Sequence, residues 1–164
     1  MEGVSLFQDD FRKINTTLEK LKRWTQANAL LLIDRAGQLI TSIGNTSELD
    51  ITSFATLSAA DFAATKQLAS LIGEEEFSDL FHEGVRENIY VSMVDSKVIL
   101  VVLFDKRSTL GLVRVRTTQT SREISEIFKT IYEKLESHST PTAKTVLDSD
   151  FAREAEEELD NLFK

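Results

Sequence analysis

The sequence contains one seven-residue apolar run, Val98–Phe104, that holds no polar residue. A strand with one face in water alternates polar and apolar residues, so a strand without alternation is expected to be buried on both faces. The preceding segment, Glu87–Val94, also has the composition of a strand, and Asp95–Lys97 joins the two as a hairpin turn. We therefore predict a sheet that is covered by helices on both faces.

The N-terminal part predicts a helix followed by a second hairpin. The helix is expected over residues 5–27, where apolar residues recur in steps of three and four. Ser5 and Gln8 predict a capping box at its start. The hairpin strands are expected at Ala29–Ile33 and Leu39–Ile43, because turn-forming residues separate and follow them.

A middle helix is expected at Asp50–Ile72, which contains no Gly or Pro over 23 residues. On a helical projection its apolar residues cover an arc of about 200°, which is wider than contact with one sheet face requires. The arc contains Ile51, Phe54, Leu57, Phe62, Ala64, Leu68, Leu71 and Ile72. The opposite side, expected to be exposed, carries small or weakly polar residues and one lysine: Ala59, Ala60, Ala63, Lys66 and Gln67. This helix is therefore predicted to allow close approach from two sides.

The remaining elements complete the fold prediction. The charged stretch Glu74–Glu83 is expected to hold a brief edge strand, since charges discourage edge pairing. The last helix is expected over residues 108–137, although Leu112–Arg116 alternates as a strand does. The order helix, hairpin, helix, strand, hairpin, helix predicts an α+β sandwich with a five-stranded antiparallel sheet.

We expect one domain, residues 5–137, followed by a tail. Residues 138–146 contain the only proline and predict a linker. Residues 147–164 predict an acidic amphipathic helix, which needs another surface to bury its apolar stripe. The stripe residues expected to dock are Phe151, Leu159, Leu162 and Phe163. A partner protein is one receiving surface, and the chain's own domain is the alternative.

The charge balance argues against nucleic acid as a ligand. The chain has 19 Lys and Arg against 27 Asp and Glu, a net charge of −8, which repels phosphate backbones. Without cysteine, the chain has no disulfides, thiolate nucleophiles or cysteine-based zinc sites. The first residues lack the features of a secretory signal, and no apolar run approaches the roughly 20 residues of a membrane span. We expect a soluble, cytoplasmic protein with no membrane insertion.

Residues for catalysis do not converge in the sequence. The six glycines are too widely spaced for a dinucleotide fingerprint or a phosphate loop. His82 and His138 match no metal-ligand spacing, and His82 is interpreted as a polar residue of the edge strand. No Ser-His-acid set is visible. We therefore expect no catalytic site, no metal and no cofactor.

Two charged features remain. Lys106, Arg107, Arg114 and Arg116 predict a modest basic patch, which could dock acidic segments or simply be a solvated face. Asp61 falls within the apolar arc of the middle helix, and the sequence gives no reason for it.

Five segments of the sequence stand out as motifs: LLIDRAGQLI, LASLIGEEEF, FHEG, VILVVLFDKRSTLGLVRVR and LDNLF. They resemble the roadblock (dynein light-chain) family, and within it the bacterial MglB family of polarity regulators. The resemblance extends from about Phe7 to Phe163. The resemblance implies a homodimer in which edge strands pair across a two-fold axis and the two middle helices lie side by side. It places the first and last helices on the other sheet face. The implied partner is MglA, a small Ras-like GTPase, with one GTPase for each dimer.

The same resemblance implies a function and a site. Proteins of this family stimulate GTP hydrolysis by MglA in cell polarity and motility, so enrichment at a cell pole is expected. Ala63 and Gln67 fall where the family contacts its GTPase, although Gln67 is larger than the small residue expected there. We extend this site to the neighbouring Ala60, Ala64, Lys66 and Leu71.

The family supplies no arginine finger, so the resemblance implies that activation comes from ordering the GTPase's own switch residues. Arg107 or Arg114 acting in trans is the alternative within this sequence. An alternative function is a scaffold that localises a small GTPase irrespective of its nucleotide state.

Overall fold

The structure is a computed structural model that describes residues 2–138, 157 and 161. The chain divides into two units, residues 1–127 and residues 128–164. In the second unit, the ring centroids of Phe128 and Tyr132 lie 6.0 Å apart. The predicted linker beyond His138 and the predicted docking residues of the tail lie outside the described residues: Phe151, Leu159, Leu162 and Phe163.

The order of elements agrees with the prediction, and the α+β fold with a five-stranded antiparallel sheet is confirmed. The elements are α1 (Glu2–Thr25), β1 (Ala29–Asp34), β2 (Leu39–Gly44), α2 (Ile51–Leu71), β3 (Asp79–His82), β4 (Asn88–Met93), β5 (Val98–Phe104) and α3 (Leu110–His138). One local prediction is wrong. Helix α1 begins at Glu2, so Ser5 lies inside the helix and does not cap its start.

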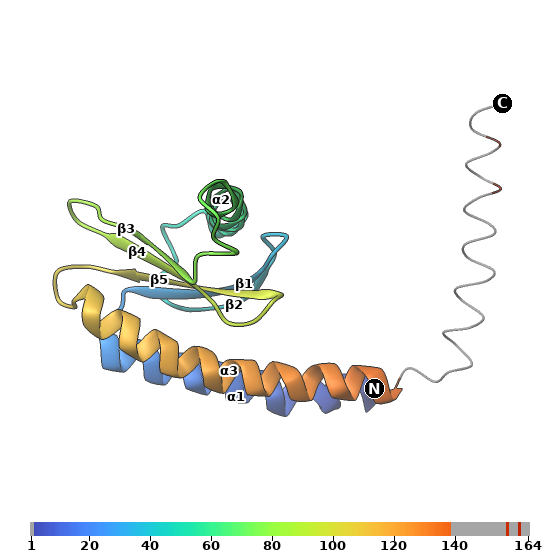
Figure 1. Ribbon diagram of the computed structural model, residues 1–164. Helices are drawn as coiled ribbons and strands as arrows, with labels where there is room; N and C mark the ends of the chain where they lie inside the picture. The colour runs from blue at the N-terminus through green and yellow to red at the C-terminus, as the bar shows by residue number, and fades with distance from the viewer. Residues whose placement is uncertain (1, 139–156, 158–160, 162–164) are drawn as a thin grey trace. The chain divides into compact units, whose positions relative to one another are not determined.

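The five strands have the order β2-β1-β5-β4-β3, and every neighbouring pair is antiparallel. The central strands β1 and β5 pair with Leu31 opposite Val101, and both residues are fully buried. Helix α2 covers one face of the sheet, while α1 and the first part of α3 lie side by side on the other (Figure 1). Helices on both faces explain why the β5 sequence needs no polar alternation.

Helix α2 packs on the sheet through its small residues, which corrects the predicted orientation. Its buried residues are Ala55, Ser58, Ala59, Phe62 and Ala69. Of the predicted apolar arc, Phe62 alone is buried, and Ile51 and Phe54 are partly buried against the core. Ala59, predicted to be exposed, faces the sheet instead. Small side chains let the helix backbone approach the sheet closely, so the larger side chains are left on the outer surface.

The start of α2 is fixed by Asp50, the N-cap residue. Its Oδ1 accepts a hydrogen bond from the Ser53 backbone N–H at 3.2 Å, and its Oδ2 accepts one from the Ser53 hydroxyl at 2.7 Å. These two hydrogen bonds lower the pKa of Asp50. The cap therefore positions the first turn of the helix on which the predicted site lies.

We expect Gly37→Ala to destabilise the fold by about 2–4 kcal/mol, as the sum of backbone strain and a steric clash. Gly37 has φ +87° in the β1–β2 turn, and a Cβ there would lie 2.7 Å from the Cα of Thr56 in α2. Gly73→Ala is the matched control: its φ is +81°, but no atom lies within 4 Å of the added carbon. Urea unfolding should show a loss of about 1 kcal/mol for this control. Equal losses for the two variants would contradict tight packing at Thr56.

Candidate partner-binding helix

The outer face of α2 exposes large apolar side chains. Leu57 and Leu68 are 68% and 58% exposed, and Leu71 and Ile72 are 82% and 68% exposed. Single exposed apolar residues are common, but a row of them along one surface marks a contact site. All six predicted GTPase-binding residues are exposed on this helix: Ala60, Ala63, Ala64, Lys66, Gln67 and Leu71. The structure thus brings the predicted residues onto one helix surface, and their binding role stays a prediction.

Part of this apolar surface lies on the side of α2 that faces strand β3. Leu57, Asp61, Ala64 and Leu68 follow one another in steps of four and three, so they share one face of the helix. Oδ2 of Asp61 lies 2.6 Å from Nε2 of His82, the last residue of β3. This contact gives Asp61 the role that the sequence left unexplained. It also places His82 on the edge strand, as predicted.

On another side of α2, three of the predicted residues line a cavity. The cavity has a volume of about 150 Å³, and its lining residues are Arg35, Ala59, Phe62, Ala63, Lys66, Gln67, Glu76 and Ile99. Two of the lining residues, Arg35 and Glu76, are not among the predicted site residues, and they lie 41 positions apart in two charged loops. Nη2 of Arg35 lies 2.7 Å from Oε1 of Glu76, and Nζ of Lys66 lies 3.9 Å from the same oxygen. The predicted contact surface therefore includes a small pocket with charged residues among its lining.

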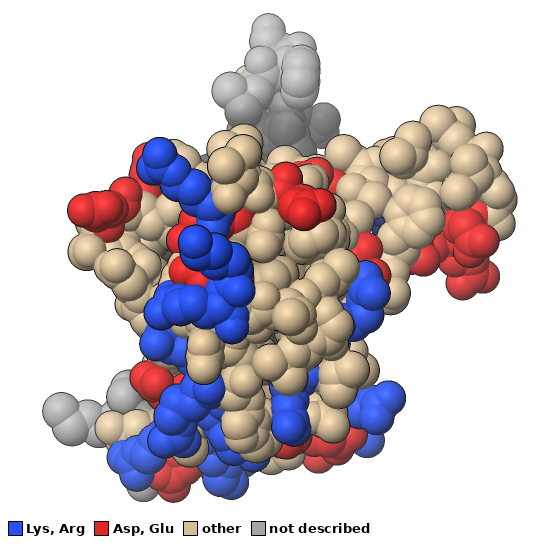
Figure 2. All heavy atoms as spheres, turned by 90° about the vertical axis from the view of Figure 1, so that its left-hand side faces the viewer, with Lys and Arg blue, Asp and Glu red and all other residues tan. Residues whose placement is uncertain are grey.

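Three of the four cations in the predicted basic patch have identified partners: Arg107, Arg114 and Arg116. Figure 2 shows Lys and Arg side chains gathered on the end of the molecule where α1 ends and the β5–α3 loop lies. There, Arg107 hydrogen-bonds Asp105 through its side chain and its backbone N–H, which lowers the pKa of Asp105 to about 2. Arg116 lies 4.6 Å above the centre of the Trp24 ring. Lys106 is exposed in the same loop.

Arg114 lies in a polar network on the sheet face opposite α2. Its Nε donates to Oδ2 of Asp79 at 3.0 Å, and the Tyr90 hydroxyl donates to the same oxygen at 2.6 Å. Burial and the hydrogen bond to Asp79 raise the pKa of Tyr90. Because Arg114 is on α3, across the sheet from α2 (Figure 1), it does not belong to the predicted contact surface.

Within residues 2–138, 157 and 161, no group of three or more His, Asp or Glu side chains is arranged to hold a metal ion. None of the helices in the same part of the chain combines the length and apolar composition that crossing a bilayer requires.

Comparison with known proteins identifies the family. The Roadblock/LC7 domain family matches residues 13–104. MglB of Myxococcus xanthus is 46% identical, with a TM-score of 0.70 over 73% of this chain and 90% of that chain. An MglB with a tetrameric arrangement is 30% identical, with a TM-score of 0.69 over 72% and 89%. The gliding protein MglB of Thermus thermophilus is 31% identical, with a TM-score of 0.68 over 72% and 90%.

A search of curated proteins finds no match. The family match includes all five strands and α2. Both the family match and the structural match agree with the resemblance to the roadblock family seen in the sequence. The chain belongs to the Roadblock/LC7 family, and MglB proteins are among the solved structures that resemble it.

Proposed function

We propose that this chain is a homodimeric regulator of an MglA-type small GTPase and that it stimulates GTP hydrolysis in cell polarity and motility. The observation that carries the proposal is the exposed outer face of α2, which combines small residues with exposed leucines in a chain 46% identical to an MglB. A surface of this kind suits a flat protein contact better than a pocket for a small substrate.

The dimer is supported by the position of the exposed leucines. Leu57 and Leu68 lie on the side of α2 nearest β3, and β3 is an edge of the sheet. Two copies that pair their β3 edges would therefore bring their α2 helices together and bury these leucines in the same step. One similar MglB structure has a tetrameric arrangement, which supports association between copies in this family.

The proposed activation needs no catalytic group from this chain. Helix α2 contains no arginine, Arg107 is paired with Asp105, and Arg114 lies across the sheet. We therefore propose that the α2 surface holds the GTPase's switch residues in a hydrolytic arrangement. Each tenfold increase in rate requires the activation free energy to fall by about 1.4 kcal/mol. Ordering a mobile loop of the GTPase can supply enough free energy for a large acceleration.

The test is single-turnover GTP hydrolysis by the MglA from the same source, with and without a two-fold excess of this chain. We expect the rate to rise by a hundredfold or more. An unchanged rate with equal affinity for the GTP-bound and GDP-bound forms would make the chain a scaffold that localises the GTPase. Failure to bind either form would remove the GTPase as the partner.

A further inference from the structure

The cavity beside α2 has two chemically different parts. Ala59, Phe62 and Ile99 are buried and give it an apolar lining, while Arg35, Lys66 and Glu76 are partly exposed and carry charge. A cavity of about 150 Å³ accepts a benzene-sized group, and therefore the end of a leucine or phenylalanine side chain. Ala63 and Gln67 also line it, so it opens on the surface predicted to contact the GTPase.

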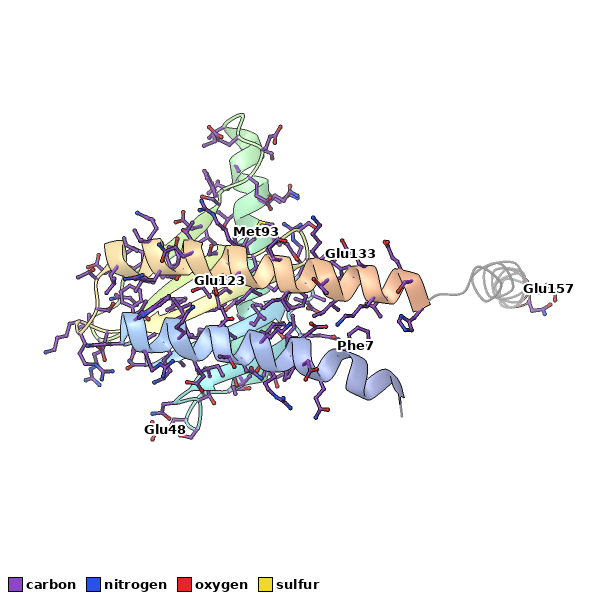
Figure 3. All side chains as sticks on the ribbon, turned by 90° about the horizontal axis from the view of Figure 1, so that it is seen from below. Phe7, Glu48, Met93, Glu123, Glu133 and Glu157 are labelled. Carbon is purple, nitrogen blue, oxygen red and sulfur yellow. The ribbon has the colours of Figure 1, made fainter. Side chains whose placement is uncertain are left out.

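The charges around the cavity do not balance. Among the residues that the structure describes, Glu76 is the one carboxylate that contacts both Arg35 and Lys66, which leaves one positive charge in excess. Arg35 also contacts Sδ of Met93 at 3.5 Å, at the end of β4. Figure 3 shows Met93 beside the C-terminal half of α2, where this helix extends past α3 in that view. The side chains of Arg35 and Lys66 are 39% and 50% exposed, so the excess charge is accessible to solvent and favours a partner that presents a carboxylate.

We propose that this cavity is a specificity subsite for the GTPase, which inserts one apolar side chain flanked by a carboxylate. Glu76 competes with that carboxylate for Arg35 and Lys66 and so limits the affinity. The inference rests on the proposed function and adds to it the chemistry of the partner segment. Arg35 is a positioning residue here, because it orients the entering carboxylate and has no part in GTP hydrolysis itself.

The test measures the affinity of MglA for this chain at two salt concentrations. Glu76→Gln keeps a hydrogen-bond acceptor for Arg35 and removes the competing charge, so we expect binding to become threefold to tenfold tighter. Arg35→Gln should weaken binding by a similar factor and reduce its dependence on salt, since the contact is electrostatic. In the variant that carries both substitutions, most of the increase in affinity from Glu76→Gln should be lost, because that increase depends mainly on Arg35.

Glu75→Gln is the matched control, since Glu75 is an exposed carboxylate in the same loop. We expect it to change the affinity by less than twofold. The subsite is refuted, and the proposed function stands, if the Glu76→Gln and Glu75→Gln variants bind MglA with equal affinity while Ala63→Arg still abolishes binding. If the unsubstituted chain does not bind MglA, both inferences are overturned.

Discussion

Ala63→Arg is expected to abolish stimulation of GTP hydrolysis, with a loss of a hundredfold or more in single-turnover rate. Ala63 is exposed on α2 and lines the cavity next to Lys66 and Gln67. An arginine there fills the cavity and projects from a surface that the GTPase must approach closely, which separates the two proteins. The rate in the presence of this variant should fall to that of the GTPase alone.

Two further variants test whether the loss of stimulation depends on the position of the arginine on α2. Ala63→Ser adds a single atom and should keep most of the stimulation. Thr118→Arg introduces the same bulk and charge at an exposed position of α3, across the sheet from α2, and should stimulate hydrolysis as the unsubstituted chain does. Full stimulation by a folded Ala63→Arg protein would exclude this surface of α2 from the contact.

The sheet was predictable because its sequence signals are local. The seven consecutive apolar residues of β5 indicate by themselves that both faces of this strand are buried. The turn residues between β4 and β5 predict the hairpin that joins these strands. The length of α2 was equally clear, since no Gly or Pro interrupts it. In each of these cases, residues close together in the chain carry the whole physical reason.

The orientation of α2 was not predictable from its apolar arc. The helical projection places Leu57 and Leu68 in the apolar arc and Ala59 on the side expected to be exposed, whereas the structure buries Ala59 and leaves both leucines exposed. The backbone of α2 can approach the sheet closely only where its side chains are small. The leucines therefore lie on the outer surface of the helix. The exposed leucines are therefore the strongest sign that this helix has a second contact to make.

The cavity beside α2 could not be predicted for a different reason. Arg35 and Glu76 each occupy a charged loop, and such residues are typical of solvated turns. Their ion pair joins loops that the fold alone brings together. Lys66 was included in the predicted site as a neighbour of Ala63, with no sign of its contact to Glu76.

Leu68→Asp is expected to dissociate the proposed homodimer. Burying a leucine side chain contributes about 1.5–3 kcal/mol, and two-fold symmetry removes that contribution twice. The variant also places two carboxylates in an apolar contact, so the dimer dissociation constant should rise by about 10²-fold or more. Sedimentation equilibrium measures this change directly. The monomer should remain folded, because Leu68 is 58% exposed within one chain.

Val115→Asp is the matched control, since Val115 is 56% exposed on α3, on the opposite face of the sheet. It should leave the dissociation constant within twofold of the unsubstituted value. Because the proposed GTPase surface lies on paired α2 helices, Leu68→Asp should also lower the stimulation of hydrolysis at concentrations where the variant is monomeric. A variant that stays dimeric would show that the exposed leucines of α2 face another partner, and the pairing of two copies would then have to use a different surface.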